Sequence, residues 1–119
     1  MDECIFCQII KKAIPGDIVY EDDRFLAFKD IHPKAPIHLL VVPKEHIASV
    51  NDAQEKDEGL MGALILTAKK VAAKEGFIDS GYKLLFNVGR GGGQLIDHIH
   101  LHILSGGYSR PIAEIQHYF

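Results

Sequence analysis

In the first part of the chain, the spacing of the apolar positions changes twice, and each spacing predicts a different element. Residues 4–12 (CIFCQIIKK) carry apolar side chains at helical spacing before a Pro-Gly pair, which predicts a short first helix. Residues 17–30 are typical of two strands around the turn Asp22-Asp23, so we expect a β-hairpin. Residues 37–43 (IHLLVVP) form a continuous apolar run that predicts a buried strand.

A single long amphipathic segment follows. Residues 51–76 have apolar side chains three and four positions apart, which predicts one long helix. Asn51 or Asp52 can cap its start, acidic residues fill its first turn, and Gly76 stands at its exit. We therefore expect the helix to begin directly after this cap and to end at the glycine.

The last patterned segments are two short apolar runs and a tail. Residues 82–88 (YKLLFNV) and 98–104 (HIHLHIL) predict two further strands, with the glycine loop 89–94 between them. From about residue 105 to residue 119 the sequence has little pattern. A hairpin, a strand, a helix and two strands predict one α+β domain, residues 1–119, around a five-stranded antiparallel sheet.

The strand predicted at 98–104 contains a histidine at every second position. On a helix, residues two apart point about 200° apart, so the rings of His98, His100 and His102 would splay around the axis. On a strand all three rings share one face, and Ile99 and Leu101 point to the other. The strand therefore predicts a row of imidazoles beside a core face.

Composition and charge exclude several classes of protein. The chain has 119 residues, is 47% hydrophobic and carries a formal charge of −3, with no clustered basic footprint. This argues against long nucleic acid as a partner, although a small phosphorylated ligand is compatible. No segment has the roughly 18 apolar residues of a membrane span, and the first residues lack the basic region of a signal peptide. We expect a cytoplasmic protein without a membrane partner, with two reduced cysteines.

The loop GRGGGQ, residues 89–94, allows two interpretations. It lacks the Lys-Ser/Thr of a Walker loop and leads into a strand, so it fits neither common nucleotide fingerprint. On its own it is typical of a flexible hairpin turn. Beside a histidine row, however, its backbone N–H groups could be presented to a phosphate.

The pair Cys4-x-x-Cys7 also leaves two readings open. The chain lacks the βαβ pattern that usually surrounds a redox pair of this spacing. The cysteines could supply half of a tetrahedral zinc site, completed by histidines, or could be two buried thiols that pack as small hydrophobic groups.

For the histidine row itself, two kinds of chemistry compete. One is a catalytic zinc site of the carbonic anhydrase kind, in which an HxH strand and a further histidine leave an open water position. The other is nucleophilic catalysis on phosphorus, in which one imidazole attacks and its neighbours bind phosphate oxygens and protonate the leaving group. The adjacent glycine loop favours phosphorus.

Residues 98–104 match HφHφHφφ, where φ is hydrophobic, and the chain thereby resembles the histidine triad (HIT) superfamily of nucleotide hydrolases and transferases. Residues 4–47 are similar to the family's opening, with the segment PKAPIHLLVVPKEHI, and GYKLLFNVGRGGGQ is similar to its GYR…N.G..GGQ element. The branch that it most resembles is the bacterial-type Hint (histidine triad nucleotide-binding) branch. The resemblance implies the HIT fold.

This resemblance implies an activity and a set of residues. It implies a hydrolase of purine nucleoside phosphoramidates or related nucleotidyl conjugates, in which His100 forms a nucleotidyl-histidine intermediate and water then releases AMP or GMP. His102 would bind phosphate oxygen and help to protonate the leaving group. The implied catalytic set is His38, His98, His100 and His102. The implied substrate-binding set is Asp30 for the ribose, Phe6, Ile9, Ile14, Phe28 and Ile31 around base and sugar, and Asn87, Gly93 and Gln94 near the phosphate.

The resemblance also implies a metal and an assembly. Some bacterial members hold structural zinc at positions that correspond to Cys4, Cys7, His46 and His98. Such a closed site would stabilise the fold, and we expect neither an organic cofactor nor a metal in the chemical step. The family is usually a homodimer. Two histidines, His32 and His117, are interpreted as solvated bystanders.

Two residues depart from the family pattern. Many related sequences have serine or threonine directly after GGQ, where this chain has Leu95, which cannot donate a hydrogen bond. Asp97 stands where an aromatic residue is common, and alternation would turn it away from the row. Two other functions therefore stay open: a nucleotide-binding or protein-interaction module with little catalysis, and a dinucleoside polyphosphate hydrolase.

Overall fold

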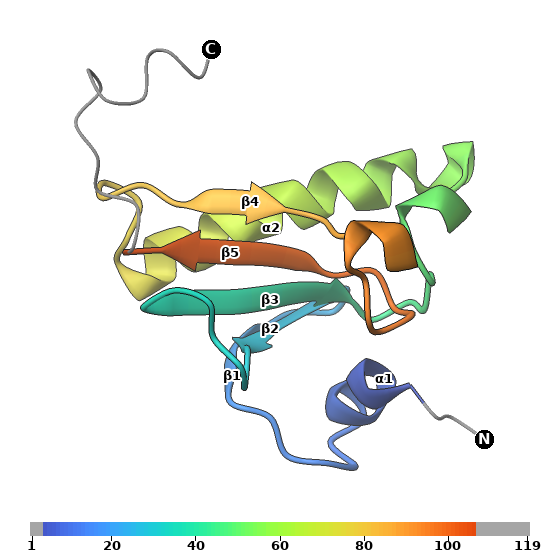
Figure 1. Cartoon of the computed structure of the whole chain (residues 1–119), viewed down its shortest axis with the longest axis horizontal. Helices are drawn as coiled ribbons and strands as arrows, with labels where there is room; N and C mark the ends of the chain where they lie inside the picture. The colour runs from blue at the N-terminus through green and yellow to red at the C-terminus, as the bar shows by residue number, and fades with distance from the viewer. Residues whose placement is uncertain (1–3, 107–119) are drawn as a thin grey trace.

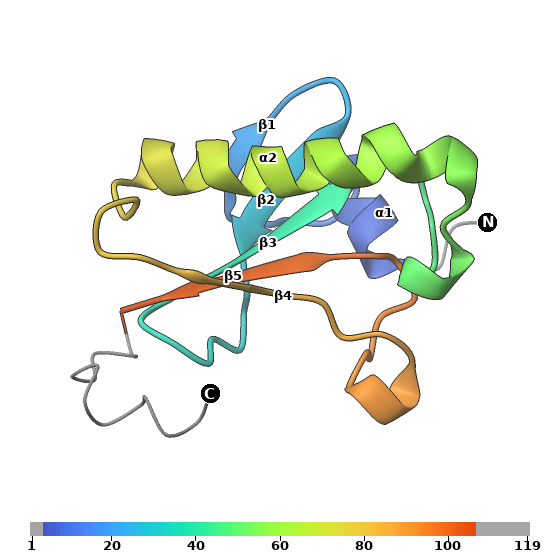
Figure 2. The same cartoon turned by 90° about the horizontal axis from the view of Figure 1, so that it is seen from above.

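The computed structural model describes residues 4–106 and contains one antiparallel sheet between two helices (Figures 1 and 2). The strands pair in the order β1-β2-β3-β5-β4, and every neighbouring pair is antiparallel. The predicted α+β class, with five strands, a short first helix and a long helix, is confirmed. The main elements are α1 (Ile5–Ile10), β1 (Ile18–Glu21), β2 (Phe25–Lys29), β3 (Ile37–Pro43), α2 (Glu58–Glu75), β4 (Lys83–Leu85) and β5 (Leu101–Ser105).

The two faces of the sheet have different partners. Because side chains alternate along a strand, Phe25 and Ala27 of β2 pack with α2, whereas Leu26 and Phe28 pack with α1. In Figure 2, α2 runs along the length of the sheet, and the short α1 lies beyond its other face. Both faces are therefore covered at the central strands, which explains why the predicted strand 37–43 is apolar without interruption.

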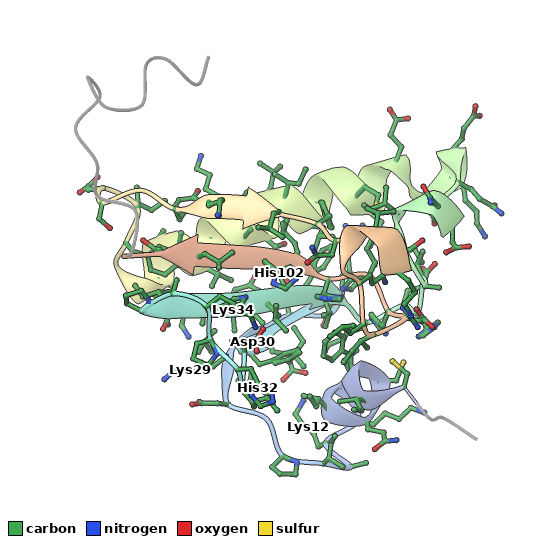
Figure 3. The ribbon with its side chains drawn as sticks, in the orientation of Figure 1. Lys12, Lys29, Asp30, His32, Lys34 and His102 are labelled. Atoms are coloured by element: carbon green, nitrogen blue, oxygen red, sulfur yellow. The ribbon has the colours of Figure 1, made fainter. Side chains whose placement is uncertain are left out.

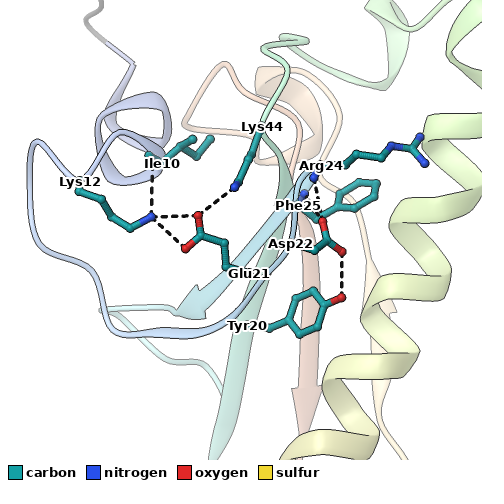
Figure 4. A network of polar contacts seen from close by, with 8 residues as sticks. All are labelled: Ile10, Lys12, Tyr20, Glu21, Asp22, Arg24, Phe25 and Lys44. Atoms are coloured by element: carbon teal, nitrogen blue, oxygen red, sulfur yellow. Dashed lines mark hydrogen bonds and ion pairs between the residues drawn. The ribbon is translucent and has the colours of Figure 1, made fainter.

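The predicted hairpin forms, and its turn is held by Asp22. The carboxylate of Asp22 accepts hydrogen bonds from the backbone N–H groups of Arg24 and Phe25, both at 2.8 Å, and from the hydroxyl of Tyr20 at 2.8 Å (Figure 4). An aspartate that bonds to the backbone two residues ahead stabilises a turn locally. The predicted turn position is therefore correct.

An exposed ionic group ties the segment after α1 to the hairpin and to β3. Lys12 donates to both carboxylate oxygens of Glu21 at 3.0 Å, and Lys44 donates to one of them at 2.8 Å (Figure 4). These lysines lower the pKa of Glu21. Surface pairs contribute little free energy singly, but this group joins three separate segments and thereby helps to position α1.

The start predicted for the long helix is wrong. Two short 3₁₀ turns, Val50–Asp52 and Glu55–Asp57, come first, and α2 begins only at Glu58. Neither Asn51 nor Asp52 caps it. Ala53 and Gln54 between the turns are extended, and the side chain of Asp57 accepts the N–H of Gln54 at 2.9 Å. Such local side-chain bonds compete with helix formation. The predicted exit is correct, because Gly76 is left-handed at φ 86°.

The strand predicted at 98–104 begins three residues later, at Leu101. The ladder pairs Val41 with Leu101, so two residues further along the same register would set Pro43 opposite Ile99. Proline has no N–H to donate, and its carbonyl oxygen is 2.8 Å from Nε2 of His98. The N–H of Ile99 donates instead to Ile47 at 2.7 Å. The strand predicted at 82–88 is also shorter, Lys83–Leu85.

Among the residues described, no helix has the length and apolar character that crossing a membrane requires. The tail predicted from about residue 105 lies outside the described residues from 107 onward, and so does His117. Residues 104 and 105 still belong to β5.

Candidate functional site

A cavity of about 790 Å³ opens on the face of the sheet that carries α1. His38 of β3, His100 and His102 line it, and Figure 3 shows His102 on the ribbon of β5. Two of the three histidines of the predicted row thus face the cavity. The predicted residues that line the cavity are Phe6, Ile9, Ile14, Phe28, Asp30, Ile31, His38, Asn87, Gly93, His100 and His102.

The row of three histidines is divided between two places. His98 is fully buried and does not line the cavity; its Nδ1 faces Cys4 Sγ at 3.4 Å and Cys7 Sγ at 3.5 Å. The ring of Phe6 lies between the two places, 6.0 Å from the His98 ring and 5.0 Å from that of His100. No cluster among the described residues lets all three histidines share one ion, which argues against the carbonic anhydrase arrangement.

The hydrogen bonds of His100 define its tautomer. Its Nδ1 lies 2.8 Å from the carbonyl oxygen of His98, and a carbonyl only accepts, so Nδ1 carries the proton. Nε2 therefore keeps its lone pair on the cavity side of the ring. Burial lowers the pKa of His100, which keeps the ring neutral. A neutral ring with a free Nε2 lone pair can act as a nucleophile.

Two successive hydrogen bonds, from Lys34 to His38 and from His38 to His102, orient His102. The backbone N–H of Lys34 donates to Nδ1 of His38 at 3.0 Å, so the proton of His38 sits on Nε2. That Nε2 lies 2.9 Å from Nδ1 of His102 and donates to it. The proton of neutral His102 is consequently on its Nε2, which is buried and has no hydrogen-bond partner among the described residues. An unpartnered buried N–H beside a cavity can serve a ligand.

The charges around His102 explain its titration. Burial, with smaller effects of His100 and His38, lowers the pKa of His102 to about 4, while Asp30 raises it. Burial also lowers the pKa of His38, and the Asp30 carboxylate, 3.4 Å from its Nε2, acts in the opposite direction. The imidazole rings of His38, His100 and His102 are therefore neutral before a ligand binds, with one carboxylate near His38 and His102.

Asp30, His38 and His102 are close enough to hold an ion, with donor atoms within 4.8 Å of one another. The hydrogen bond from the backbone N–H of Lys34 to Nδ1 of His38 argues against a metal ion at this place. Because that bond occupies the Nδ1 lone pair of His38, its Nε2 carries a proton and has no lone pair for a metal.

Cys4, Cys7, His46 and His98 form the second place, with ligand atoms within 4.8 Å of one another. Cys7 Sγ is 3.3 Å from His46 Nδ1, and the Nδ1 atoms of His46 and His98 are 3.1 Å apart. Ligands of one small tetrahedral ion are about 3.5 Å apart, so the spacing fits a shared metal ion. The bond from His98 Nε2 to the carbonyl of Pro43 leaves Nδ1 unprotonated, as a ligand requires.

The glycine loop is held by its own hydrogen bonds. Gln94 is 1% exposed and does not line the cavity; its side chain accepts from Gly89 N at 2.9 Å and donates to Ala48 O at 2.7 Å and to Ile96 O at 2.9 Å. The N–H groups of residues 92, 93 and 94 donate to carbonyl oxygens inside the loop. The N–H groups of residues 92, 93 and 94 are thus already bonded within the loop, and Gln94 anchors the loop.

The two departures from the family pattern lie in different places. Leu95 lines the cavity and is 82% exposed. Asp97 does not line it, and its carboxylate pairs with Arg90 through contacts of 2.9 and 3.0 Å. The expectation that Asp97 turns away is consistent with this contact.

Several residues that the sequence analysis overlooked also line the cavity. His32 is exposed, as expected, but lies at the cavity wall and not apart from it (Figure 3). Alternation along β5 could have identified Leu104, two residues after His102. Pairing could have identified Leu85, which lies opposite His102. The other overlooked lining residues include Lys29, Lys34 and Lys83.

Comparisons with known proteins identify the family. The family described as "Scavenger mRNA decapping enzyme C-term binding" matches residues 3–117. Purine nucleoside phosphoramidase of Escherichia coli (strain K12) is 47% identical over 112 residues, which cover 94% of this chain and 92% of that protein. Protein HitA of Neisseria gonorrhoeae is 46% identical over 104 residues, which cover 87% of this chain and 96% of that protein.

Among solved structures, a HIT family hydrolase from Legionella pneumophila Philadelphia 1 superposes with a TM-score of 0.86 at 48% identity. The match covers 91% of this chain and 96% of that one. A histidine triad protein from Clostridium difficile gives a TM-score of 0.88 at 41% identity, over 93% and 96% of the two chains. On the sequence motif, the fold and these relatives, the chain belongs to the histidine triad superfamily.

Proposed function

We propose that this protein hydrolyses purine nucleoside phosphoramidates, with His100 as nucleophile and His102 as proton donor. The observation that carries the proposal is the pair of tautomers described above. A lone pair on His100 and an N–H on His102 belong to rings whose centroids are 4.9 Å apart, beside one cavity. The similarity to a purine nucleoside phosphoramidase supports this choice of substrate.

In the first step, Nε2 of His100 attacks the α-phosphorus and the P–N bond to the amine breaks. The negative phosphoryl group raises the pKa of His102, as Asp30 already does, so Nδ1 of His102 takes up one proton in the bound complex and His102 becomes an imidazolium. The Nε2–H of His38 then donates to the Asp30 carboxylate, 3.4 Å away, in place of His102. The imidazolium gives its Nε2 proton to the departing nitrogen, which receives the electrons of the P–N bond. The products are the free amine and a nucleotidyl-histidine.

In the second step, water attacks the phosphorus. Its oxygen forms a new P–O bond and one of its protons returns to His102, while the electrons of the P–Nε2 bond return to His100. AMP or GMP is released and the nucleophile is restored. His102 thus donates one proton to the amine and then accepts another from water, as general acid and general base.

The nucleoside would lie between α1 and the end of β2. Phe6 and Phe28 are edge to face, with ring centroids 5.3 Å apart, and provide an apolar surface for the base and sugar together with Ile9, Ile14 and Ile31. The Asp30 carboxylate, 18% exposed, can accept the hydroxyls of a ribose. Asn87 and Gly93, which line the cavity, would lie on the phosphate side, and Gln94 would act through the loop that it anchors.

The site of Cys4, Cys7, His46 and His98 would hold structural zinc. Two thiolates and two imidazoles are a usual zinc ligand set, and four protein ligands leave no open position for substrate. When bound, the ion would join the start of α1 to the segment after β3 and to the segment before β5. The reaction would need neither this metal nor an organic cofactor. Thiolate ligands stay reduced in the cytoplasm, which supports a cytoplasmic location.

We further propose that the protein is a homodimer with a single domain per chain. β4 is an edge strand of the sheet, so its outer backbone groups can pair with those of a second copy. Ile65 and Leu66 of α2 are 47% and 60% exposed and give apolar surface that a second copy could cover.

The test compares AMP release from adenosine 5′-phosphoramidate by the wild type and by His100→Asn, with zinc quantified in both. We expect turnover only in the wild type, with equal zinc content and equal thermal stability. A wild type that binds AMP but does not turn over would favour a binding module. Faster cleavage of diadenosine polyphosphate than of the phosphoramidate would favour the alternative hydrolase.

A further inference from the structure

The cavity has a wall beyond His102 that the nucleoside does not need. Leu85 of β4 lies directly opposite His102 in the ladder, and Leu104 follows on the same face of β5. Leu95 reaches the same cavity from the end of the glycine loop. We call Leu85, Leu95 and Leu104 the leucine wall.

The position of this wall relates it to the leaving group. The predicted nucleoside residues belong to α1 and to the end of β2, while His100 and His102 stand between them and β4. A phosphorus held at the two histidines has its nucleoside on the first side, so its amine substituent points to the side of β4 and the loop. The leucine wall is therefore the surface that a departing amine meets.

Hydrogen bonds of the preceding loop hold the backbone next to Leu95 in place at the cavity. The side chain of Gln94 makes three hydrogen bonds within and around the loop, and Arg90 donates to the carbonyl of Gln94 at 2.6 Å. Despite this order, the Leu95 side chain is 82% exposed. A large apolar side chain that is held rigidly at a cavity gains free energy when an apolar ligand covers it.

The charged residues near the leucine wall disfavour a leaving amine that carries an additional positive charge. Acidic side chains line the cavity only at Asp17 and Asp30, both near β2, and the lining residue of β4 next to Leu85 on this face is Lys83. Asp97, the acidic residue closest to Leu95 in sequence, is paired with Arg90 outside the lining. An ammonium group at the leucine wall would lose water without gaining a carboxylate.

We propose that the leucine wall is a leaving-group subsite that selects conjugates of uncharged, apolar amines over conjugates of amines that carry a second cation. This inference rests on the proposed phosphoramidase function and adds the chemistry of the amine. No new bond-making step is involved, because the same P–N bond breaks and only the amine differs.

The test uses two substrates that differ only at the far end of the amine: adenosine 5′-phosphoramidates of hexylamine and, through one nitrogen, of 1,6-diaminohexane. We expect the wild type to favour the hexylamine conjugate in kcat/KM by about tenfold. Leu95→Ser should reduce this preference about fivefold, because part of an apolar contact is lost. Leu95→Asp should reduce it further, since the new carboxylate can pair with the terminal ammonium.

A matched control is Ile78→Ser, which makes the same kind of change at an exposed residue outside the cavity and should leave the preference unchanged. Comparing two substrates in one variant cancels any general loss of activity. A wild-type preference near one, or a preference that neither Leu95 variant alters, overturns the inference and leaves the proposed function standing. If the wild type releases AMP from neither conjugate nor from unsubstituted adenosine 5′-phosphoramidate, both proposals fail.

Discussion

Acidification from pH 7 to pH 5 should destabilise the wild-type protein by about 2 kcal/mol more than its His102→Asn variant. Burial first, and then the charges of His100 and His38, lower the pKa of His102 from 6.5 to about 4. In the unfolded chain this histidine titrates near 6.5. Below pH 6.5 the unfolded state therefore binds a proton that the folded state does not, and asparagine has no such proton to bind.

The size of the expected loss in unfolding free energy follows from the interval between the two pKa values of His102, 6.5 in the unfolded chain and about 4 in the folded protein. Above pH 6.5 the titration of His102 does not reduce the free energy of unfolding. As the pH falls from 6.5 toward about 4, the pKa of His102 in the folded protein, the free energy of unfolding decreases by about 1.4 kcal/mol per pH unit. At pH 5 the loss is about 2 kcal/mol, and at pH 4 it is about 3 kcal/mol. Below that pH both states bind the proton and the loss stops.

Urea unfolding followed by far-UV circular dichroism measures this difference. Both proteins are studied with bound zinc, at one protein concentration, at pH 7 and pH 5. Effects of acid on the metal site and on carboxylates are common to both and cancel in the difference. The variant His32→Asn replaces an exposed histidine of the same cavity and should follow the wild type. If the difference between wild type and His102→Asn is the same at both pH values, burial does not hold His102 neutral and the reasoning is refuted.

Three further predictions concern the fold. Cys7→Ser should abolish stoichiometric zinc binding and lower the thermal midpoint, measured by metal analysis and calorimetry; unchanged stability would contradict a structural metal. Gly93→Ala should cost about 1–2 kcal/mol in chemical unfolding, because φ is 88° and a Cβ would lie 3.3 Å from Asn87 Nδ2. Gly62→Ala in α2, where a Cβ meets open space, should instead stabilise by about 0.5–1 kcal/mol, and equal effects would refute the comparison. Leu64→Ala, on the face of α2 that is fully buried against the sheet, should cost about 2–5 kcal/mol in the same assay, and a loss below 1 kcal/mol would contradict its place in the core.

Elements with a local cause could be predicted from the sequence. The hairpin turn depends on Asp22 and its own neighbours, and the end of α2 depends on the left-handed Gly76. Both were placed correctly because the deciding contacts lie within a few residues. The start of α2 was misplaced because Asp57 caps a preceding turn and not the helix itself.

The start of β5 could not be predicted in the same way. It depends on Pro43, a residue 56 positions before Ile99 in the chain, since 99 − 43 = 56. The spacing of the histidines was sufficient to predict a strand. It did not show where the ladder stops, because only the register of β3 against β5 sets a proline opposite Ile99.

By itself, the sequence determined the element types, the histidine motif and the family, because alternation, turn residues and motif spacing are local properties of the chain. Only the tertiary structure decided where each of the three histidines lies and which ring nitrogen carries its proton. Phe6 and the cysteines of α1 separate His98 from His100, and the N–H of Lys34 sets the proton on His102 by way of His38. It also turned Asp97 toward Arg90 and left Leu95 in the cavity. Hydrogen-bond direction and burial arise from contacts between distant segments, so no spacing along the chain contains them.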